Sequence, residues 1–537
     1  LHPRVRRQRQ MCIRDRLKMD NAFLTWLKSA VILGVVLGLS GCDKLNSPKS
    51  TNTVSEEQPT QSQSIEQENT SKPSRTLLTR AFTHSPSFEP WFVRYPEQEN
   101  LLRDLYEGLT AYDQEGRIVP GIAESWQTKD NKTWIFTLRE GLRWSNGEPL
   151  VAQDVMLSWQ ALSQSNSPLR SYLAYLNLKN AKGVLEKNKP FKSLGIYAEN
   201  DRTLRIELDK PTPHLPEMLA HISLVPQYSD PDSPVTNGAY MIESESVRSI
   251  HLAKNPYYWQ KNNVAFERVA YLPFVAPKLA EFDVVVDVPE VHSDLQHFPK
   301  LCEYFYEFNL NDPKLAKADV RKAIASLVSV TNIVNNEIPA AIPSSYFLPK
   351  AMLNGQDSRW EPVVAEQLLA QNKIDEKHPL HLNVLYDDAP LHVNIAQRLV
   401  GQLTQSDMLR VDAQPVNWQT LQAKRQKGDF QVIRSGWCAD FNHPMAFLGL
   451  FYSKSPDNKN GYANAEYDQL FEQALKSLNE KERSEIYLKL SEKIQQENLA
   501  LPLFQYTTPV YLSPTIMGAK KNPVGVIYST VSYTHLT

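Results

Sequence analysis

The chain has 537 residues, a formal net charge of -2 and a hydrophobic content of 42%. A nearly neutral body without a basic stripe excludes the usual electrostatic signature of a nucleic-acid-binding protein. The 36 prolines against 19 glycines, and the lack of an internal repeat, indicate a large, loop-rich protein that is too long for a single hydrophobic core.

Residues 19–42 have the pattern of a secretion signal, with a polar start, an apolar run over residues 30–39 and small residues before a cysteine. The apolar run is too short for a stable transmembrane helix. The sequence LSGC that ends at Cys42 resembles a bacterial lipobox, in which the cysteine is acylated; an ordinary cleaved signal is the alternative. Because Asp43 resembles an inner-membrane retention signal, we expect a lipoprotein on the periplasmic face of the inner membrane, or on the cell surface if the source is Gram-positive.

Both ends of the chain are expected to contain non-native sequence. A secretion signal works at an N-terminus, so residues 1–18 are expected to be a foreign leader before the signal peptide at residues 19–41. Residues 531–537 also look foreign. Residues 42–74 consist mainly of Ser, Thr, Gln, Glu, Lys and Pro, which cannot form a core, so we expect a lipidated and disordered tether.

The body of the chain carries interleaved strand and helix signals. Residues 133–144 alternate apolar and polar side chains around a turn and predict strand structure. Residues 152–162 place apolar side chains at helical spacing and predict a helix. Further strands are predicted at residues 203–208, 282–288, 381–385 and 430–433. The pattern predicts a mixed α/β fold.

Two helices are predicted near the C-terminus. Residues 466–477 have one apolar face, and Asn464 is predicted to be the N-cap. The next helix begins at Asn479, and Glu482 three residues later predicts a capping box.

Four cysteines leave one candidate pair in the body of the chain. Cys12 lies in the expected leader and Cys42 is the expected anchor, so Cys302 and Cys438 remain. In an oxidising compartment two remaining cysteines most simply form one disulfide, and two unrelated thiols are the alternative.

Five stretches resemble one known family. They are YEGLTAYDQEGRIVPGIAESW (residues 106–126), WIFTLREGLRWSNGEPLVAQDVMLSWQ (134–160), VTNGAYMI (235–242), NPYYW (255–259) and GWCAD (436–440). Together they resemble the bacterial extracellular solute-binding proteins of the peptide and nickel class, and within it the oligopeptide-binding proteins of ABC importers. The resemblance covers residues 76–527.

The resemblance implies an α/β clamp of three lobes. Two lobes close on the ligand, and a third is inserted in the first. Lobe I is expected to contain residues 75–107, 227–301 and 503–530, lobe II residues 108–226, and lobe III residues 302–502. It also implies a monomer that binds short extended peptides and delivers them to permease subunits, with no cofactor, no metal and no nucleic acid.

The resemblance further implies which residues bind the two ends of a peptide. Asp440 matches the family residue that pairs with the terminal ammonium, since an unpaired buried charge costs several kcal/mol. Arg434, Arg425 and His392 fall where the family anchors the peptide carboxylate, and the guanidinium fork suits that partner. The alternative for each is a surface charge. The resemblance also implies that Cys302 and Cys438 are bridged.

Five more residues are expected around the ligand. Trp437 and Trp418 are predicted pocket walls, with core tryptophans as the alternative. Tyr304, Phe305 and Glu307 lie beside Cys302 and are expected to line the same cleft. The peptide backbone would pair as an added strand, which tolerates many side chains.

The ligand and the class of protein leave alternatives open. Arg94 stands where typical members have an acidic residue and could favour acidic peptides. The same fold could bind a dipeptide, murein tripeptide, glutathione, haem or nickel, although no His/Cys cluster supports a metal site. A secreted hydrolase that uses Cys438 beside His443 is the alternative from another class, and a chaperone-like role is a third.

Overall fold

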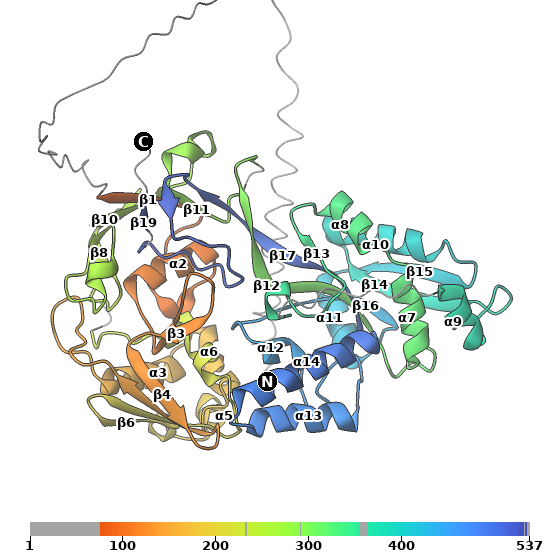
Figure 1. The fold of residues 1–537 in the computed structure, drawn as a ribbon, viewed down its shortest axis with the longest axis horizontal. Helices are drawn as coiled ribbons and strands as arrows, with labels where there is room; N and C mark the ends of the chain where they lie inside the picture. Colours follow the sequence, from red (N-terminus) through yellow and green to blue (C-terminus); the bar gives the residue numbers. More distant parts are fainter. Residues whose placement is uncertain are drawn as a thin grey trace, which may run out of the picture. The chain divides into compact units, whose positions relative to one another are not determined.

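The structure is a computed structural model that describes residues 76–230, 234–246, 248–289, 292–353 and 364–530, with the backbone of residues 532–533 (Figure 1). The predicted leader, signal peptide, Cys42 anchor and tether lie outside the described residues.

The largest sheet has 11 strands in the order β15-β14-β16-β12-β17-β11-β1-β10-β9-β8, and β13 pairs with β17 off this path. Its strands are β1 (Leu77–Phe82), β8 (Tyr240–Ser246), β9 (Ser249–Lys254), β10 (Arg268–Pro273), β11 (Val284–Val286), β12 (Gln296–Phe308), β13 (Ile342–Pro343), β14 (Leu380–Asp387), β15 (Leu409–Val416), β16 (Val432–Cys438) and β17 (Ala500–Leu512). The strands β12 and β17 have 13 residues each and run antiparallel through the middle of this order.

One end of this sheet is parallel and is covered by helices. β14 pairs in parallel with β15 and with β16, and parallel neighbours need crossover connections. These are α10 (Pro390–Leu403) and α11 (Trp418–Lys427), while α7 (Ala318–Ser326), α8 (Val330–Glu337) and α9 (Ala365–Gln371) add further cover (Figure 1). In α10 the apolar residues Ile395, Leu399 and Leu403 recur on one face, so this face packs on β14 and β15.

A second, antiparallel sheet is built from strands that lie in the sequence between β1 and β8 of the large sheet. Its order is β4-β5-β7-β6, with β4 (Ala123–Thr128), β5 (Thr133–Leu138), β6 (Ile196–Asn200) and β7 (Thr203–Glu207). In β5, Trp134, Phe136 and Leu138 are buried and alternate with less buried residues, as expected for a strand with one covered face. The helix α3 (Ala152–Gln164) packs against β6 and β7.

The remaining elements lie outside these two sheets. They are β2 (Thr110–Tyr112), β3 (Ile118–Pro120), β18 (Ile516–Met517), β19 (Ser532–Tyr533), α2 (Pro96–Leu105), α4 (Tyr172–Tyr175), α5 (Ala181–Leu185), α6 (Leu215–Leu219), α12 (Met445–Leu448), α13 (Ala465–Lys476), α14 (Glu480–Gln496) and the 3-10 turns η1 (Pro90–Phe92), η2 (Pro168–Ser171), η3 (Phe191–Ser193), η4 (Ile222–Leu224), η5 (Lys261–Asn263), η6 (Ala276–Glu281) and η7 (Lys350–Met352).

The predicted caps of the last two helices are observed, but the capping box is not. The side chain of Asn464 accepts a hydrogen bond from Tyr467 N at the start of α13, and that of Asn479 accepts from Glu482 N at the start of α14. The Glu482 carboxylate does not return to the Asn479 backbone, because it accepts hydrogen bonds from Ser477 and Gln473 of α13 instead. The prediction of a capping box was therefore wrong.

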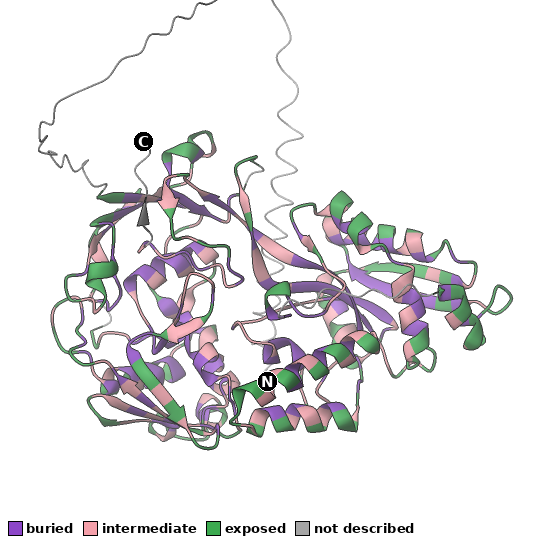
Figure 2. Cartoon of the chain, in the orientation of Figure 1, coloured by how far each residue is buried: buried purple, intermediate pink, exposed green. Residues whose placement is uncertain are grey.

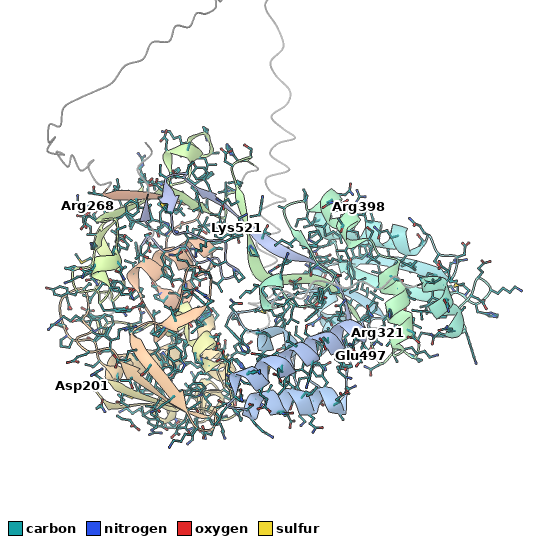
Figure 3. All side chains as sticks on the ribbon, viewed as in Figure 1. Asp201, Arg268, Arg321, Arg398, Glu497 and Lys521 are labelled. Carbon is teal, nitrogen blue, oxygen red and sulfur yellow. A yellow bond between two sulfur atoms is a disulfide. The ribbon has the colours of Figure 1, made fainter. Side chains whose placement is uncertain are left out.

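A buried arginine ties α7 to the end of α14. The Arg321 side chain is 2% exposed and donates to the carbonyl oxygens of Leu315 and Ala316, just before α7. It also donates to the carbonyls of Glu497 and Asn498, where α14 ends (Figure 3). Arg321 thereby satisfies helix-end acceptors that have no partner inside their own helix.

The hydrophobic residues form several separate clusters. The largest combines residues of the four-stranded sheet and α3 with residues of α12, α13 and α14. A second lies under α7, α8, α9 and α10. In Figure 2, α13 and α14 alternate buried and exposed residues along their length, as amphipathic helices do. The expectation that the chain is too long for one core is confirmed.

Candidate functional site

The segment GWCADFNHP begins inside β16 and is fixed there by a disulfide. Cys302 of β12 and Cys438 of β16 are direct partners in the antiparallel register, with Cα atoms 4.0 Å apart, and their sulfur atoms are bonded. The expected bridge is therefore present. A cysteine in a disulfide has no thiolate, so the alternative of Cys438 as a nucleophile fails.

The second half of this segment packs against the region of the smaller sheet. Phe441 is buried and stacks on His214, and Asn442 donates to the carbonyl of Gly116 at 2.9 Å. The ring of His443 stacks on that of His214 with centroids 5.0 Å apart. The loss of solvent around the rings lowers the pKa of His214 to about 3 and that of His443 well below its usual value. His443 is thus a neutral packing residue.

Arg434 lies at the centre of a buried polar cluster. Its Nη1 is 3.3 Å from Asp387 Oδ2, and its Nη2 is 3.0 Å from His392 Nε2. His392 Nδ1 is 2.6 Å from Asp387 Oδ1. The guanidinium also lies 4.8 Å from the ring centroid of Tyr304 and 5.7 Å from that of Trp418. The structure thus brings four predicted residues together and adds Asp387.

The charges of this cluster follow from burial and from the contacts. Burial, with the Arg434 charge, lowers the pKa of His392 to about 4, so His392 is neutral at pH 7. Burial opposes ionisation of Asp387, but the His392 hydrogen bond and the Arg434 charge outweigh it and hold its pKa below the usual value. Burial likewise opposes the charge on Arg434, yet its pKa is raised by Tyr304 and Asp387. The cluster contains one positive and one negative charge.

Several polar atoms around Arg434 make no hydrogen bond of ordinary geometry. They are Arg434 Nε, Asp387 Oδ2 and the buried hydroxyls of Tyr304, Tyr306 and Tyr506. Buried polar atoms in native proteins nearly always have a protein or water partner. These atoms therefore indicate a place for ordered water or for polar atoms of a ligand.

The second predicted anchor, Arg425, is separated from this cluster. Its Nη2 is 2.5 Å from Glu307 Oε1, and the Glu307 side chain is 6% exposed. Side chains alternate along β12, so Glu307 lies on the opposite face of the sheet from Tyr306, which pairs with Arg434. Arg425 and Arg434 consequently do not form one binding site for the same carboxylate in this structure.

The remaining predicted residues have different surroundings. Phe305 is 2% exposed and packs on Phe347. Trp437 is partly buried and donates its Nε1 to the carbonyl of Ala446. Asp440 is partly buried. Arg94 is exposed, and among the described residues no hydrogen bond or ion pair joins its side chain to another predicted site residue.

Glu303, a buried acid next to the disulfide, was not predicted from the sequence. Glu303 is 0% exposed and pairs in register with Trp437 on one side and with Gln505 on the other. Neither of its carboxylate oxygens has a hydrogen-bond partner among the described residues, and burial raises its pKa well above the usual value. The signal available in the sequence was an acidic residue flanked by Cys302 and Tyr304.

Replacing Glu303 with glutamine is expected to stabilise the protein at pH 7. Burial raises the pKa of the Glu303 carboxyl in the folded state. The protein therefore loses stability as the pH rises above about 4.5, because this carboxyl ionises in the unfolded chain first. The gain should therefore be present at pH 7 and should vanish below about pH 4.5, where the carboxyl is protonated in both states. Urea unfolding across this pH range measures it. The exposed Glu376→Gln is the control, and an equal response of both variants would contradict the prediction.

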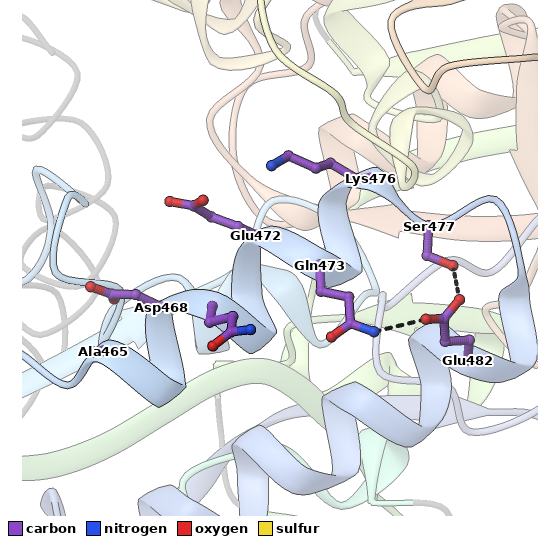
Figure 4. A pocket seen from close by; sticks show the side chains of 8 residues that line it. Ala465, Asp468, Glu472, Gln473, Lys476, Ser477 and Glu482 are labelled. Atoms are coloured by element: carbon purple, nitrogen blue, oxygen red, sulfur yellow. Dashed lines mark hydrogen bonds between the residues drawn. The ribbon is translucent and has the colours of Figure 1, made fainter.

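One surface groove is formed by α13 and the start of α14, with a volume of about 740 Å³ (Figure 4). Its lining includes Asp468, Glu472, Lys476 and Glu482, and Glu482 is occupied by hydrogen bonds from Gln473 and Ser477. None of the predicted site residues lines it. Among the described residues there is also no group of three or more His, Cys, Asp or Glu side chains suited to a metal ion.

Within the described part of the chain, no helix combines the length and the apolar character needed to cross a membrane.

Comparison with known proteins gives concordant matches. Residues 117–459 match the profile of the bacterial extracellular solute-binding proteins, family 5. A binding protein of Haemophilus influenzae is 55% identical over 95% of this chain and 98% of its own length. The periplasmic oligopeptide-binding protein OppA of Escherichia coli is 31% identical over 86% of this chain and 92% of its own length. The periplasmic murein tripeptide binding protein MppA, solved in an unliganded open form, is 26% identical and covers 86% of this chain and 97% of its own, with a TM-score of 0.81.

These matches extend over both sheets and over the Arg434 cluster. They confirm the mixed α/β fold of periplasmic binding proteins that the sequence predicts. Cys438 is bridged to Cys302, so its sulfur is not available as a nucleophile. The chain therefore belongs to the bacterial extracellular solute-binding proteins of family 5, the substrate-binding components of ABC importers, and it is a binding protein and not an enzyme.

Proposed function

We propose that the protein binds short peptides in extended form between two lobes and delivers them to the permease of an ABC importer. The names of two relatives, an oligopeptide-binding and a murein tripeptide binding protein, support a peptide ligand. The observation that carries the proposal is the position of Asp440, two residues after the disulfide that fixes Cys438 to β12. A carboxylate on so constrained a segment is suited to a terminal ammonium.

The other proposed roles follow the same geometry. The hydroxyls of Tyr304, Tyr306 and Tyr506 near Arg434 would offer polar partners to the far end of a peptide or to water beside it. Trp437 and Trp418 would bound the pocket. Lobe III would be the region around β14, β15 and β16, and lobe II the region of the four-stranded sheet, with boundaries as predicted above.

We further propose that acylated Cys42 anchors the protein to the membrane. This rests on the lipobox-like sequence LSGC. Mass spectrometry of the N-terminal peptide from cells would show a diacylglyceryl cysteine, and an unmodified Cys42 would contradict the anchor.

The peptide ammonium should be required for binding. Ligand at a hundred times its Kd adds about 2.7 kcal/mol of stability, so a thermal-shift titration with tri-, tetra- and pentaalanine detects binding clearly. We expect the free peptides to stabilise the protein and their N-acetylated forms to do so at least tenfold more weakly, because acetylation removes the charge that pairs with Asp440.

The variant Asp440→Asn should abolish this difference, and the exposed Asp407→Asn should leave it unchanged. Equal binding of free and acetylated peptides would show that Asp440 does not bind an ammonium. If none of the peptides binds, the ligand is not a peptide of this length, and the co-purifying small molecules would have to be identified.

A further inference from the structure

The guanidinium of Arg434 already has a carboxylate partner inside the protein. Asp387 is the last residue of β14, and its side chain is 6% exposed. We propose that Asp387 is a specificity-determining residue: its carboxylate neutralises Arg434, so the Arg434 cluster accepts a ligand end that carries no negative charge, such as an amide or an ester. This inference rests on the proposed function.

The position of Asp387 is fixed by the fold. β14 pairs in parallel with β16, with Leu385 opposite Ile433, so Asp387, where β14 ends, lies beside the part of β16 that carries Arg434. His392 lies in the first turn of α10, which starts three residues after β14 ends. The strand end and the helix start thus hold the acid between its two partners, and neither partner needs to move to maintain the contact.

The hydrogen bonds also determine which form of His392 fits. Arg434 Nη2 can only donate, so His392 Nε2 must accept. His392 Nδ1 then carries the proton and donates it to Asp387 Oδ1. This is the neutral imidazole, which adds no positive charge. Arg434 and Asp387 balance each other, and the cluster has no excess cation for a ligand carboxylate.

The second arginine does not supply the missing charge. Arg425 is paired with the buried Glu307 on the opposite face of the sheet. A ligand carboxylate beside Arg434 would therefore meet Asp387 as a like charge at close range, in surroundings where charges are poorly screened. A neutral carboxamide can instead accept from Arg434 Nε and from the tyrosine hydroxyls without that repulsion.

The alternative is that Asp387 only holds Arg434 in place. In that case its removal would change stability but not the choice between charged and neutral ligands. The ratio of the affinities for the free acid and for the amide separates the two roles, because a general loss of stability does not alter this ratio.

The experiment compares tri-, tetra- and pentaalanine as free acids and as C-terminal amides, by calorimetric titration at pH 7. For the peptide length that reaches Arg434, we expect the wild-type protein to bind the amide at least tenfold more tightly than the acid. Asp387→Asn keeps an oxygen that accepts from His392 and should improve binding of the free acid at least tenfold. The adjacent and exposed Asp388→Asn is the matched control and should behave as wild type.

The outcomes are distinct. A wild-type protein that binds acids as tightly as amides, or more tightly, overturns the inference while the proposed function stands; this comparison decides even if Asp387→Asn does not fold. An unchanged acid-to-amide ratio in a folded Asp387→Asn protein also overturns it. If no peptide of either kind binds, the proposed function fails, and the inference fails with it.

Discussion

Replacing Cys302 and Cys438 together with serine is expected to lower the free energy of unfolding by about 5 kcal/mol. The disulfide closes a loop with a sequence separation of 136 residues. In the chain-entropy model, opening a loop of this length restores that much conformational freedom to the unfolded chain. The two cysteines are also direct register partners, so the bridge fits the ladder of β12 and β16.

Urea unfolding of the double variant and of wild type measures the loss. Wild type in reductant should approach the variant, whereas the variant should not respond to reductant. A difference below about 1 kcal/mol would mean that the bridge adds little to the strand pairing that already holds these residues together.

Replacing Arg321 with methionine is expected to destabilise the protein by about 3–5 kcal/mol. The side chain is buried and donates to four carbonyl oxygens, of Leu315, Ala316, Glu497 and Asn498. Methionine fills a similar volume but leaves these acceptors without a partner, and each buried unsatisfied group costs about 1–3 kcal/mol before water recovers part of it. Arg321→Lys should recover less than half of the stability that Arg321→Met loses, because one ammonium cannot reach both pairs of carbonyls as the guanidinium does.

Arg398→Met is the matched control for this variant. The Arg398 side chain is 40% exposed and pairs with Glu337, and such surface pairs contribute about 0–1 kcal/mol (Figure 3). Similar losses in both variants, measured by thermal and urea unfolding, would show that the carbonyl contacts of Arg321 are not what stabilises the end of α14.

Local features of the fold were predictable from the sequence because their causes are local. Asn464 and Asn479 were identified as caps because a side-chain acceptor before an amphipathic run suits a helix start. The capping box at Glu482 failed because Ser477 and Gln473, on the preceding helix, compete for the same carboxylate. Strand bounds shifted for a related reason: residues 430–433 suggested a strand, but pairing with β12 extends β16 to Cys438.

The polar cluster was predictable only in part. The resemblance to the family indicated Arg434 and His392, but not that they contact each other or that Asp387 joins them. Asp387 and Arg434 are 47 positions apart, and only the parallel pairing of β14 and β16 brings them together. Glu303 was missed because local sequence does not reveal that the sheet neighbours of an acid lack a cation.

The ladder between β12 and β17, which divides the large sheet into a part with β14, β15 and β16 and a part with β1, β8, β9, β10 and β11, is interrupted. The register shifts between Pro299 and Glu303, and Pro299 has no amide hydrogen to donate. No register pair joins β12 to β17 between these two positions, so we expect the pairing of these two strands to bend most easily there, while the disulfide keeps Cys302 with β16. A ligand that draws these two parts of the sheet together then breaks few hydrogen bonds. Most of the free energy of its contacts is therefore retained as affinity.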